Sequence, residues 1–190
     1  MKENILVLGA GAWGTAIANL LAENTNENVL IWGYEKKVVN EINNLSTNNT
    51  FLPKVKLNKK LIATNSYTGK KANTIFIVVP SQYVSDIIKK YLASFSVKDN
   101  LSLSLVICSK GFDLKRKKLL SQVLEAYCPL SKMAILSGPS FANLVASKRP
   151  TALTLASNNK YLAKKISLLL HNNYFRVYIN NDIISVQING

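Results

Sequence analysis

The sequence predicts an α/β fold in which a doubly wound, mostly parallel sheet carries helices on both faces. Short apolar runs with the composition of strands alternate with segments of helical periodicity along the chain, which is the pattern of repeated βαβ units. The run from Thr74 to Val79 is almost continuously β-branched or aromatic, as expected of a parallel strand covered on both faces. A glycine-rich turn between the first strand and the first helix is the third observation.

That turn lies within residues 5–16, which run from an apolar strand into a helix. Gly9, Gly11 and Gly14 have the spacing G-x-G-x-x-G of the dinucleotide-binding fingerprint. We expect Gly9 to allow a sharp turn, Gly11 to let a diphosphate approach the backbone, and Gly14 to let the helix pack closely on the sheet. The diphosphate would lie on the free N–H groups of the helix N-terminus. The turn therefore predicts a Rossmann-type cofactor site built on Gly9, Ala10, Gly11, Ala12, Trp13 and Gly14.

The end of the second strand, Val29 to Trp32, is where this fold binds the adenosine half of a dinucleotide. Glu35 could accept hydrogen bonds from the ribose hydroxyls, which favours NAD. Lys36 and Lys37 could instead attract a 2′-phosphate, which favours NADP. Tyr34 would either stack on adenine or be an ordinary exposed aromatic residue. The residues leave NAD and NADP both open, with a slight preference for NAD.

The later elements follow the same alternation. Further strands are expected at Leu61–Thr64, within 74–81, and at Leu103–Cys108, Met133–Leu136, Thr151–Ala156 and Phe175–Ile179, with helices at Lys36–Leu45, Gln82–Ala93, Lys115–Tyr127 and Lys160–His171 and a last helix starting near Asn181. In open α/β sheets, ligands bind at the carboxyl ends of the strands. Tyr83 is therefore a second candidate for the adenine, and Lys110 places a cation at the same edge. The turn 137–142 leads into a helix with Ser140 as a plausible cap, which predicts a further anion site.

Composition limits the alternatives. The chain has 190 residues with 24 Lys and Arg against 10 Asp and Glu, but the lysines are scattered among asparagines, so we expect no nucleic-acid partner. No apolar run approaches the roughly 20 residues that span a bilayer, so membrane insertion is not expected. Two cysteines and a single histidine support neither a disulfide framework nor a metal site, and fit a reducing, cytoplasmic location.

The chain resembles the NAD(P)-dependent glycerol-3-phosphate dehydrogenases throughout its length. The matching stretches are Gly9–Ala16, Phe51–Pro53, Val79–Ser81, Ser109–Phe112, Ser137–Ala142, Arg149–Thr151 and Phe175–Tyr178. The first is common to many dehydrogenases, whereas the Lys-Gly turn at Lys110 and the Gly-Pro-Ser-Phe-Ala turn at Gly138, in this order, are much more specific.

The resemblance implies reversible reduction of dihydroxyacetone phosphate to sn-glycerol 3-phosphate, feeding phospholipid synthesis. It implies that Lys110 is a catalytic residue that contacts substrate and nicotinamide, that Gly138 and Ser140 contact substrate, and that Ala142 contacts the cofactor. It also implies a small-molecule substrate and a homodimer in the full-length form.

The resemblance divides the chain at its C-terminal end. Residues 1–180 would form the cofactor domain, and 181–190 would begin an interdomain helix leading to a helical substrate domain that this sequence lacks. In the family, the lysine that acts as general acid/base follows shortly after Gly190. Hydride transfer needs a partner for the proton on the substrate oxygen, so the 190 residues alone are expected to bind cofactor but to be catalytically incomplete. The alternative is a non-catalytic dinucleotide-binding module. In either case the apolar positions Ile183, Ile184, Val186 and Ile188 are expected to lack a packing partner.

Overall fold

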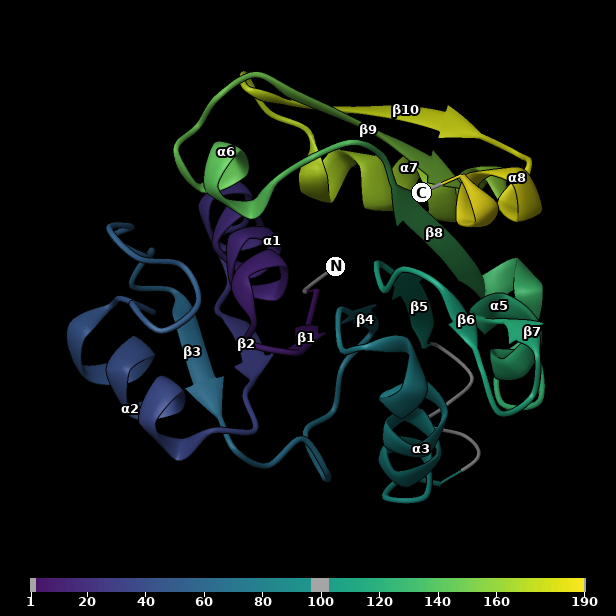
Figure 1. The fold of residues 1–190 in the computed structure, drawn as a ribbon, viewed down its shortest axis with the longest axis horizontal. Helices are drawn as coiled ribbons and strands as arrows, with labels where there is room; N and C mark the ends of the chain where they lie inside the picture. The colour runs from purple at the N-terminus through teal and green to yellow at the C-terminus, as the bar shows by residue number, and fades with distance from the viewer. Residues whose placement is uncertain (1–2, 97–102, 190) are drawn as a thin grey trace.

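The computed structural model describes residues 3–96 and 103–189 and contains one large sheet with helices on both faces (Figure 1). The eight strands of this sheet are β1 (Ile5–Leu8), β2 (Val29–Trp32), β3 (Leu61–Thr64), β4 (Thr74–Ile77), β5 (Ser104–Ile107), β8 (Met133–Ser137), β9 (Thr151–Ala156) and β10 (Phe175–Asn180). Their order is β10-β9-β8-β5-β4-β1-β2-β3. All neighbouring pairs are parallel except β8 and β9. The predicted doubly wound, mostly parallel sheet is confirmed.

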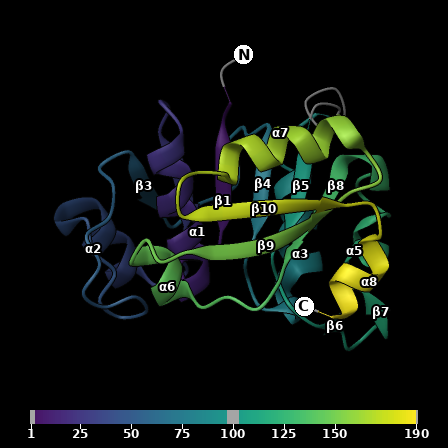
Figure 2. The same cartoon turned by 90° about the horizontal axis from the view of Figure 1, so that it is seen from above.

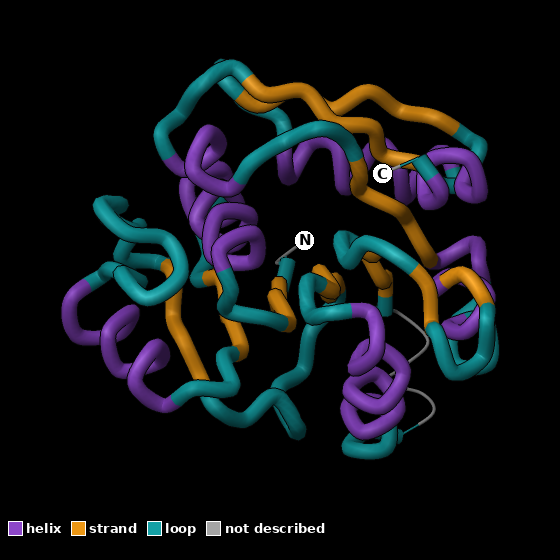
Figure 3. The backbone as a smooth tube through the Cα atoms, in the orientation of Figure 1, coloured by secondary structure: helices purple, strands orange, loops and turns teal. Residues whose placement is uncertain are grey.

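Two helical layers cover the sheet (Figure 3). The helices are α1 (Ala12–Asn24), α2 (Lys36–Leu45), α3 (Ser81–Leu92), α5 (Leu120–Leu124), α6 (Ala142–Ala146), α7 (Lys160–Leu170) and α8 (Ile183–Ile188), with a 3-10 turn η1 (Leu130–Lys132). Buried side chains of α1, α2, α6 and α7 form one core, and those of α3, α5 and α8 form the other. Adjacent residues of β1 face different cores: Val7 faces the first, and Leu6 and Leu8 face the second. Because both faces of the sheet are buried, the strands are unbroken apolar runs in the sequence.

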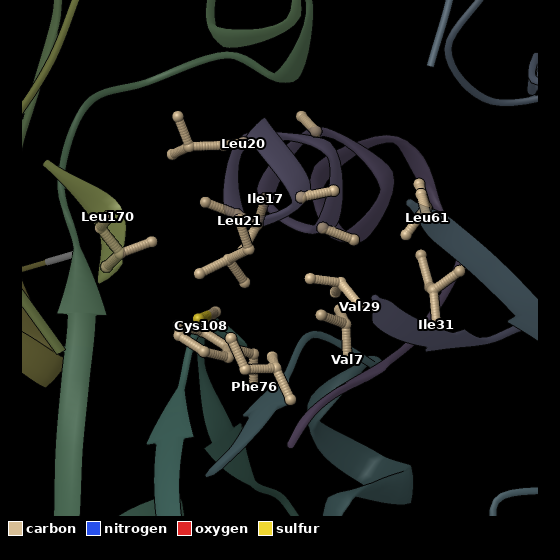
Figure 4. Packing of buried hydrophobic residues seen from close by; sticks show 14 of the residues in the cluster. Val7, Ile17, Leu20, Leu21, Val29, Ile31, Leu61, Phe76, Cys108 and Leu170 are labelled. Carbon is tan, nitrogen blue, oxygen red and sulfur yellow. The ribbon is translucent and has the colours of Figure 1, made fainter. Parts of the chain in front are cut away.

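Helix α1 is the centre of the first core (Figure 4). Its Ile17 and Leu21 are completely buried and face Val7 and Phe76 of the central strands, while Leu170 of α7 approaches from the side. The chain bends after β8 so that α6 and α7 both pack against α1 (Figure 2). Helix α1 is therefore held by packing along its whole length, which fixes the glycine turn at its N-terminus.

The predicted helix from Lys115 to Tyr127 is wrong in its first half. Residues 112–119 form a hairpin of β6 (Phe112–Asp113) and β7 (Lys118–Leu119), and α5 begins only at Leu120. The Asp113 carboxylate accepts the Arg116 backbone N–H at 2.8 Å and pairs with its guanidinium at 2.7 Å, which closes a turn in place of a helix. Lys117 completes the turn in the left-handed conformation, with a φ of +52°. Helical periodicity could not reveal this, since the turn depends on a local side-chain acceptor.

The Asp113 turn should make the stability of the protein depend on acid pH. The Arg116 backbone N–H and guanidinium hold the pKa of Asp113 below its ordinary value of 3.8. A lowered folded pKa stabilises the fold above the unfolded value, and this contribution is lost as pH falls through the folded value. We expect Asp113→Asn to lower the urea midpoint at pH 7, and the difference from the unchanged chain to shrink as pH falls below 3.8 through the lowered folded pKa of Asp113. Unfolding curves at pH 7, 4 and 2.5 test this, and a difference that stays constant over the range contradicts it.

The last helix was expected to lack a packing partner, and the structure corrects half of this expectation. Ile183 is buried and Val186 is partly buried in the second core, and the Ser121 hydroxyl of α5 donates to Gln187 Oε1 at 2.7 Å. Ile184 and Ile188 remain exposed. One face of α8 therefore packs against α5 and β8, which the sequence alone did not reveal because the partners are distant in the chain, with Ser121 66 residues before Gln187.

Candidate functional site

A cleft of about 1450 Å³ opens at the carboxyl ends of β1, β2, β4, β5 and β8. It lies at the point where the strand order reverses between β1 and β4, the position at which doubly wound folds bind their ligands. Every residue proposed for the site from the sequence, apart from Lys37, lines this one cleft: Gly9, Ala10, Gly11, Ala12, Trp13, Gly14, Tyr34, Glu35, Lys36, Tyr83, Lys110, Gly138, Ser140 and Ala142.

The glycine turn has the geometry that its spacing predicts. Gly9 has a φ of +120°, and its N–H donates to the Trp32 carbonyl at 3.0 Å, which ties the turn to β2. A Cβ on Gly14 would lie 1.9 Å from the Gly9 carbonyl oxygen, so only glycine fits there. A Cβ on Gly11 would meet nothing within 4 Å, because this residue faces the open cleft at the N-cap of α1. Gly14 therefore serves packing, whereas Gly11 leaves room for a ligand.

The adenosine end of the cleft carries exposed side chains on a fixed backbone. Tyr34 is 82% exposed, and Glu35 is also exposed at the N-cap of α2, where its side chain makes no capping hydrogen bond. Asn65 holds the backbone of this segment, because its Nδ2 donates to the Gly33 carbonyl at 2.9 Å. Of the two lysines considered for a 2′-phosphate, Lys36 lines the cleft and Lys37 does not.

The opposite end brings together two turns that are distant in the chain. Lys110 follows β5 and is exposed, and the preceding Ser109 hydroxyl donates to the Ile77 carbonyl at 3.2 Å, which fixes this turn against β4. Gly138 follows β8 with a φ of +150°, and a Cβ there would lie 2.6 Å from Leu153 Cδ2. One phosphorylated small molecule could therefore contact the ammonium group of Lys110 and the turn after β8 together.

The predicted capping role of Ser140 is wrong. The N-cap of α6 is Phe141, which makes no side-chain cap hydrogen bond, and α6 has only five residues. The Ser140 N–H instead donates to the Gly138 carbonyl at 3.0 Å, so the turn closes on itself before the helix begins. Ser140 still lines the cleft, with its hydroxyl free of helix capping.

Several cleft residues were missed by sequence reasoning. Aromatic walls come from Trp32, Phe51, Tyr67 and Phe141, and further polar groups come from Asn65, Ser66, Thr68, Lys90 and Ser109. Trp32 and Tyr67 pack edge to face with their ring centroids 4.8 Å apart. Residues 65–68 and Ser109 follow directly after predicted strands, which was the signal available for them. Lys90 lies inside α3 and gave no such signal.

Comparison with known proteins assigns the family. A family model described as the N-terminus of NAD-dependent glycerol-3-phosphate dehydrogenase matches residues 4–163. The chain belongs to this family. It is 37% identical to a glycerol-3-phosphate dehydrogenase [NAD(P)+] of Citrifermentans bemidjiense over all of this chain and 57% of that protein, and 38% identical to the protein of the same name from Neorickettsia sennetsu over 97% of this chain and 54% of that protein.

The structural comparison agrees. The crystal structure of glycerol-3-phosphate dehydrogenase from Coxiella burnetii superposes with a TM-score of 0.88 at 34% identity, covering 98% of this chain and 56% of that one. The chain thus spans a little over half the length of these relatives and corresponds to the N-terminal cofactor part of the dehydrogenase family. NAD or NADP is the cofactor of that family. In the described parts of this chain, no helix is long and apolar enough to cross a membrane.

Proposed function

We propose that this chain binds NAD(H) or NADP(H) in the cleft and provides the cofactor half of a glycerol-3-phosphate dehydrogenase. The observation that supports the proposal best is the convergence of the glycine turn, the Tyr34–Glu35 segment and the Lys110 and Gly138 turns on one cleft. Gly9–Gly14 would hold the diphosphate, Tyr34 or Tyr83 would contact the adenine, and Ala142 would contact the cofactor. Lys110, Gly138 and Ser140 would bind the substrate.

When bound, the nicotinamide would supply a hydride to the carbonyl carbon of dihydroxyacetone phosphate, and the carbonyl oxygen would take up a proton. Lys110 would attract the phosphorylated substrate and orient it toward the nicotinamide, because an ammonium group in a confined cleft stabilises nearby negative charge. The proton requires a separate acid. In the proposed division, residues 1–180 form the cofactor domain and 181–190 begin the helix that leads, in full-length members, to the substrate domain with that acid.

The proposal includes the setting of the enzyme. We propose a cytoplasmic protein that acts in glycerophospholipid synthesis, forms a homodimer in its full-length form, and has no nucleic-acid partner. Light scattering of a full-length protein tests the dimer, and DNA-shift assays at low salt test the last point, since nucleic-acid binding through scattered lysines would be strongest there.

Two measurements test the function. NADH fluorescence titration of the 190-residue chain should show saturable binding, with turnover of dihydroxyacetone phosphate at background rate. The same chain joined to the C-terminal part of the Citrifermentans bemidjiense relative should oxidise NADH when dihydroxyacetone phosphate is added. Reduction of ketopantoate in its place would refute the substrate assignment, and binding without turnover in the joined protein would support a non-catalytic dinucleotide module.

Cofactor preference should depend on Glu35. Its exposed carboxylate would repel a 2′-phosphate, although Lys36 at the same end of the cleft offsets part of this charge. Because two unit charges about 4 Å apart interact by about 1 kcal/mol when water surrounds them, as it does at this exposed side chain, Glu35→Ser should raise the ratio of NADPH to NADH affinity about fivefold. Lys37→Ser is the matched control outside the cleft and should change the ratio by less than twofold. An unchanged ratio in Glu35→Ser would mean that this side chain does not face the ribose.

A further inference from the structure

A buried amide, Asn48, lies beneath the glycine turn. It belongs to the segment between α2 and β3, has no exposed surface and does not line the cleft. Its Nδ2 donates to the Ala10 carbonyl at 2.9 Å and to the Thr15 hydroxyl at 2.8 Å, and that hydroxyl donates to the same carbonyl at 3.2 Å. Three groups that are far from solvent therefore satisfy one another around the Ala10 carbonyl oxygen.

This network determines the direction of the next N–H. The Ala10 carbonyl and the Gly11 N–H belong to one planar trans peptide, so they point in opposite directions. Since the carbonyl points into the protein toward Asn48, the N–H points out toward the cleft that Gly11 lines. Within the described residues the Gly11 N–H makes no hydrogen bond, which leaves it available to an anion.

Asn48 also holds a wall of the cleft. Its Oδ1 accepts the Phe51 N–H at 3.3 Å, and its backbone carbonyl accepts the Leu52 N–H at 2.7 Å. The Phe51 ring lines the cleft. One side chain thus connects the floor of the diphosphate site with an aromatic wall that comes from a different loop.

We propose that Asn48 is a positioning residue for the diphosphate of the cofactor. Its amide keeps the Ala10–Gly11 peptide turned so that the Gly11 N–H faces the phosphate oxygens, and Thr15 assists through its hydroxyl. This inference rests on the proposed cofactor site. It predicts a loss that is specific to phosphate-bearing ligands, whereas a general loosening of the fold would weaken all ligands alike.

The test compares ADP with adenosine, each titrated into the 190-residue chain by calorimetry or NMR. Losing an oriented donor to a charged group should raise the dissociation constant for ADP about tenfold in Asn48→Ala, and that for adenosine less than twofold. Thr15→Val keeps the shape of the side chain but lacks the hydroxyl, and should raise the ADP constant about threefold. Thr15→Ser keeps the hydroxyl and should restore ADP binding. In the unchanged chain, ADP should shift the Gly11 amide resonance, and this shift should shrink in Asn48→Ala.

The matched control is Asn19→Ala. Asn19 is also buried, and its side chain donates to Glu23 and accepts the Asn58 N–H, so it joins a loop to α1 away from the cleft. The ratio of ADP to adenosine affinity should stay within twofold there. If the ratio of ADP to adenosine affinity is unchanged in both Asn48→Ala and Thr15→Val, the inference is overturned, although ADP binding would still support the cofactor site. If Asn48→Ala does not fold, the comparison of Thr15→Val with Thr15→Ser tests the inference instead. If the unchanged chain binds neither NADH nor ADP, the proposed function itself fails.

Discussion

Gly14→Ala should destabilise the fold by about 3 kcal/mol or more, because the added methyl group meets backbone and not a movable side chain. Its Cβ would lie 1.9 Å from the Gly9 carbonyl oxygen and 3.0 Å from the Gly9 carbonyl carbon. Relief requires α1 to move away from the sheet, yet α1 is packed by α6 and α7 on its other side. Urea unfolding should show a midpoint lower by about 1–2 M.

Gly11→Ala is the matched control for this variant. Gly11 has a φ of −68° at the N-cap, and a Cβ there meets no atom within 4 Å. Its stability should therefore stay within about 0.5 kcal/mol of the unchanged chain. NADH affinity should nevertheless fall at least about tenfold, since the methyl group occupies the space through which a diphosphate reaches the backbone. Equal unfolding midpoints for the two variants would contradict the packing role of Gly14.

Lys110→Met should lower kcat/KM for dihydroxyacetone phosphate about 100-fold in the protein joined to a relative's C-terminal part, while leaving NADH binding within a few-fold. The reason is that Lys110 follows β5 beside the Gly138 turn, whereas the glycine turn and the adenosine end lie elsewhere in the cleft. Steady-state rates over a range of substrate concentration, with NADH titrations alongside, measure both quantities.

Lys115→Met serves as the control because Lys115 is an exposed lysine of the β6–β7 hairpin outside the cleft. It should leave kcat/KM unchanged. This result would show that the activity depends on a positive charge at position 110 and not on the total net charge of +14. If Lys110→Met retains full activity, the substrate is held by other groups, and the role given to Lys110 is wrong.

The strands and long helices were predictable because their signals are local. Strands buried on both faces are short and apolar, and α2 and β2 begin and end at the expected residues. The hairpin at 112–119 was not predictable from periodicity, since it depends on the Asp113 carboxylate capturing the Arg116 N–H. The packing of α8 on α5 was missed for a different reason, because it joins residues that are distant in the chain.

In the candidate site, too, local signals were predictable and long-range contacts were not. Residues that follow a strand directly could be assigned to the ligand edge, and they do line one cleft. Asn48 carried no signal, because it is neither in a motif nor beside a strand and its importance comes from a carbonyl 38 residues earlier. Buried polar groups of this kind are identified by their partners, which only the folded chain brings together.

The strand order also has a consequence for synthesis from the N-terminus. By the end of β4, the chain already contains the four-stranded block β3-β2-β1-β4, in which the first strand lies in the interior. From there each new strand of the large sheet, β5, β8, β9 and β10, pairs with the strand of that sheet made just before it, always on the same side. Each new strand therefore pairs with the exposed edge of the strand made just before it. A nascent chain can extend its sheet in step with translation, without reopening any pair already formed.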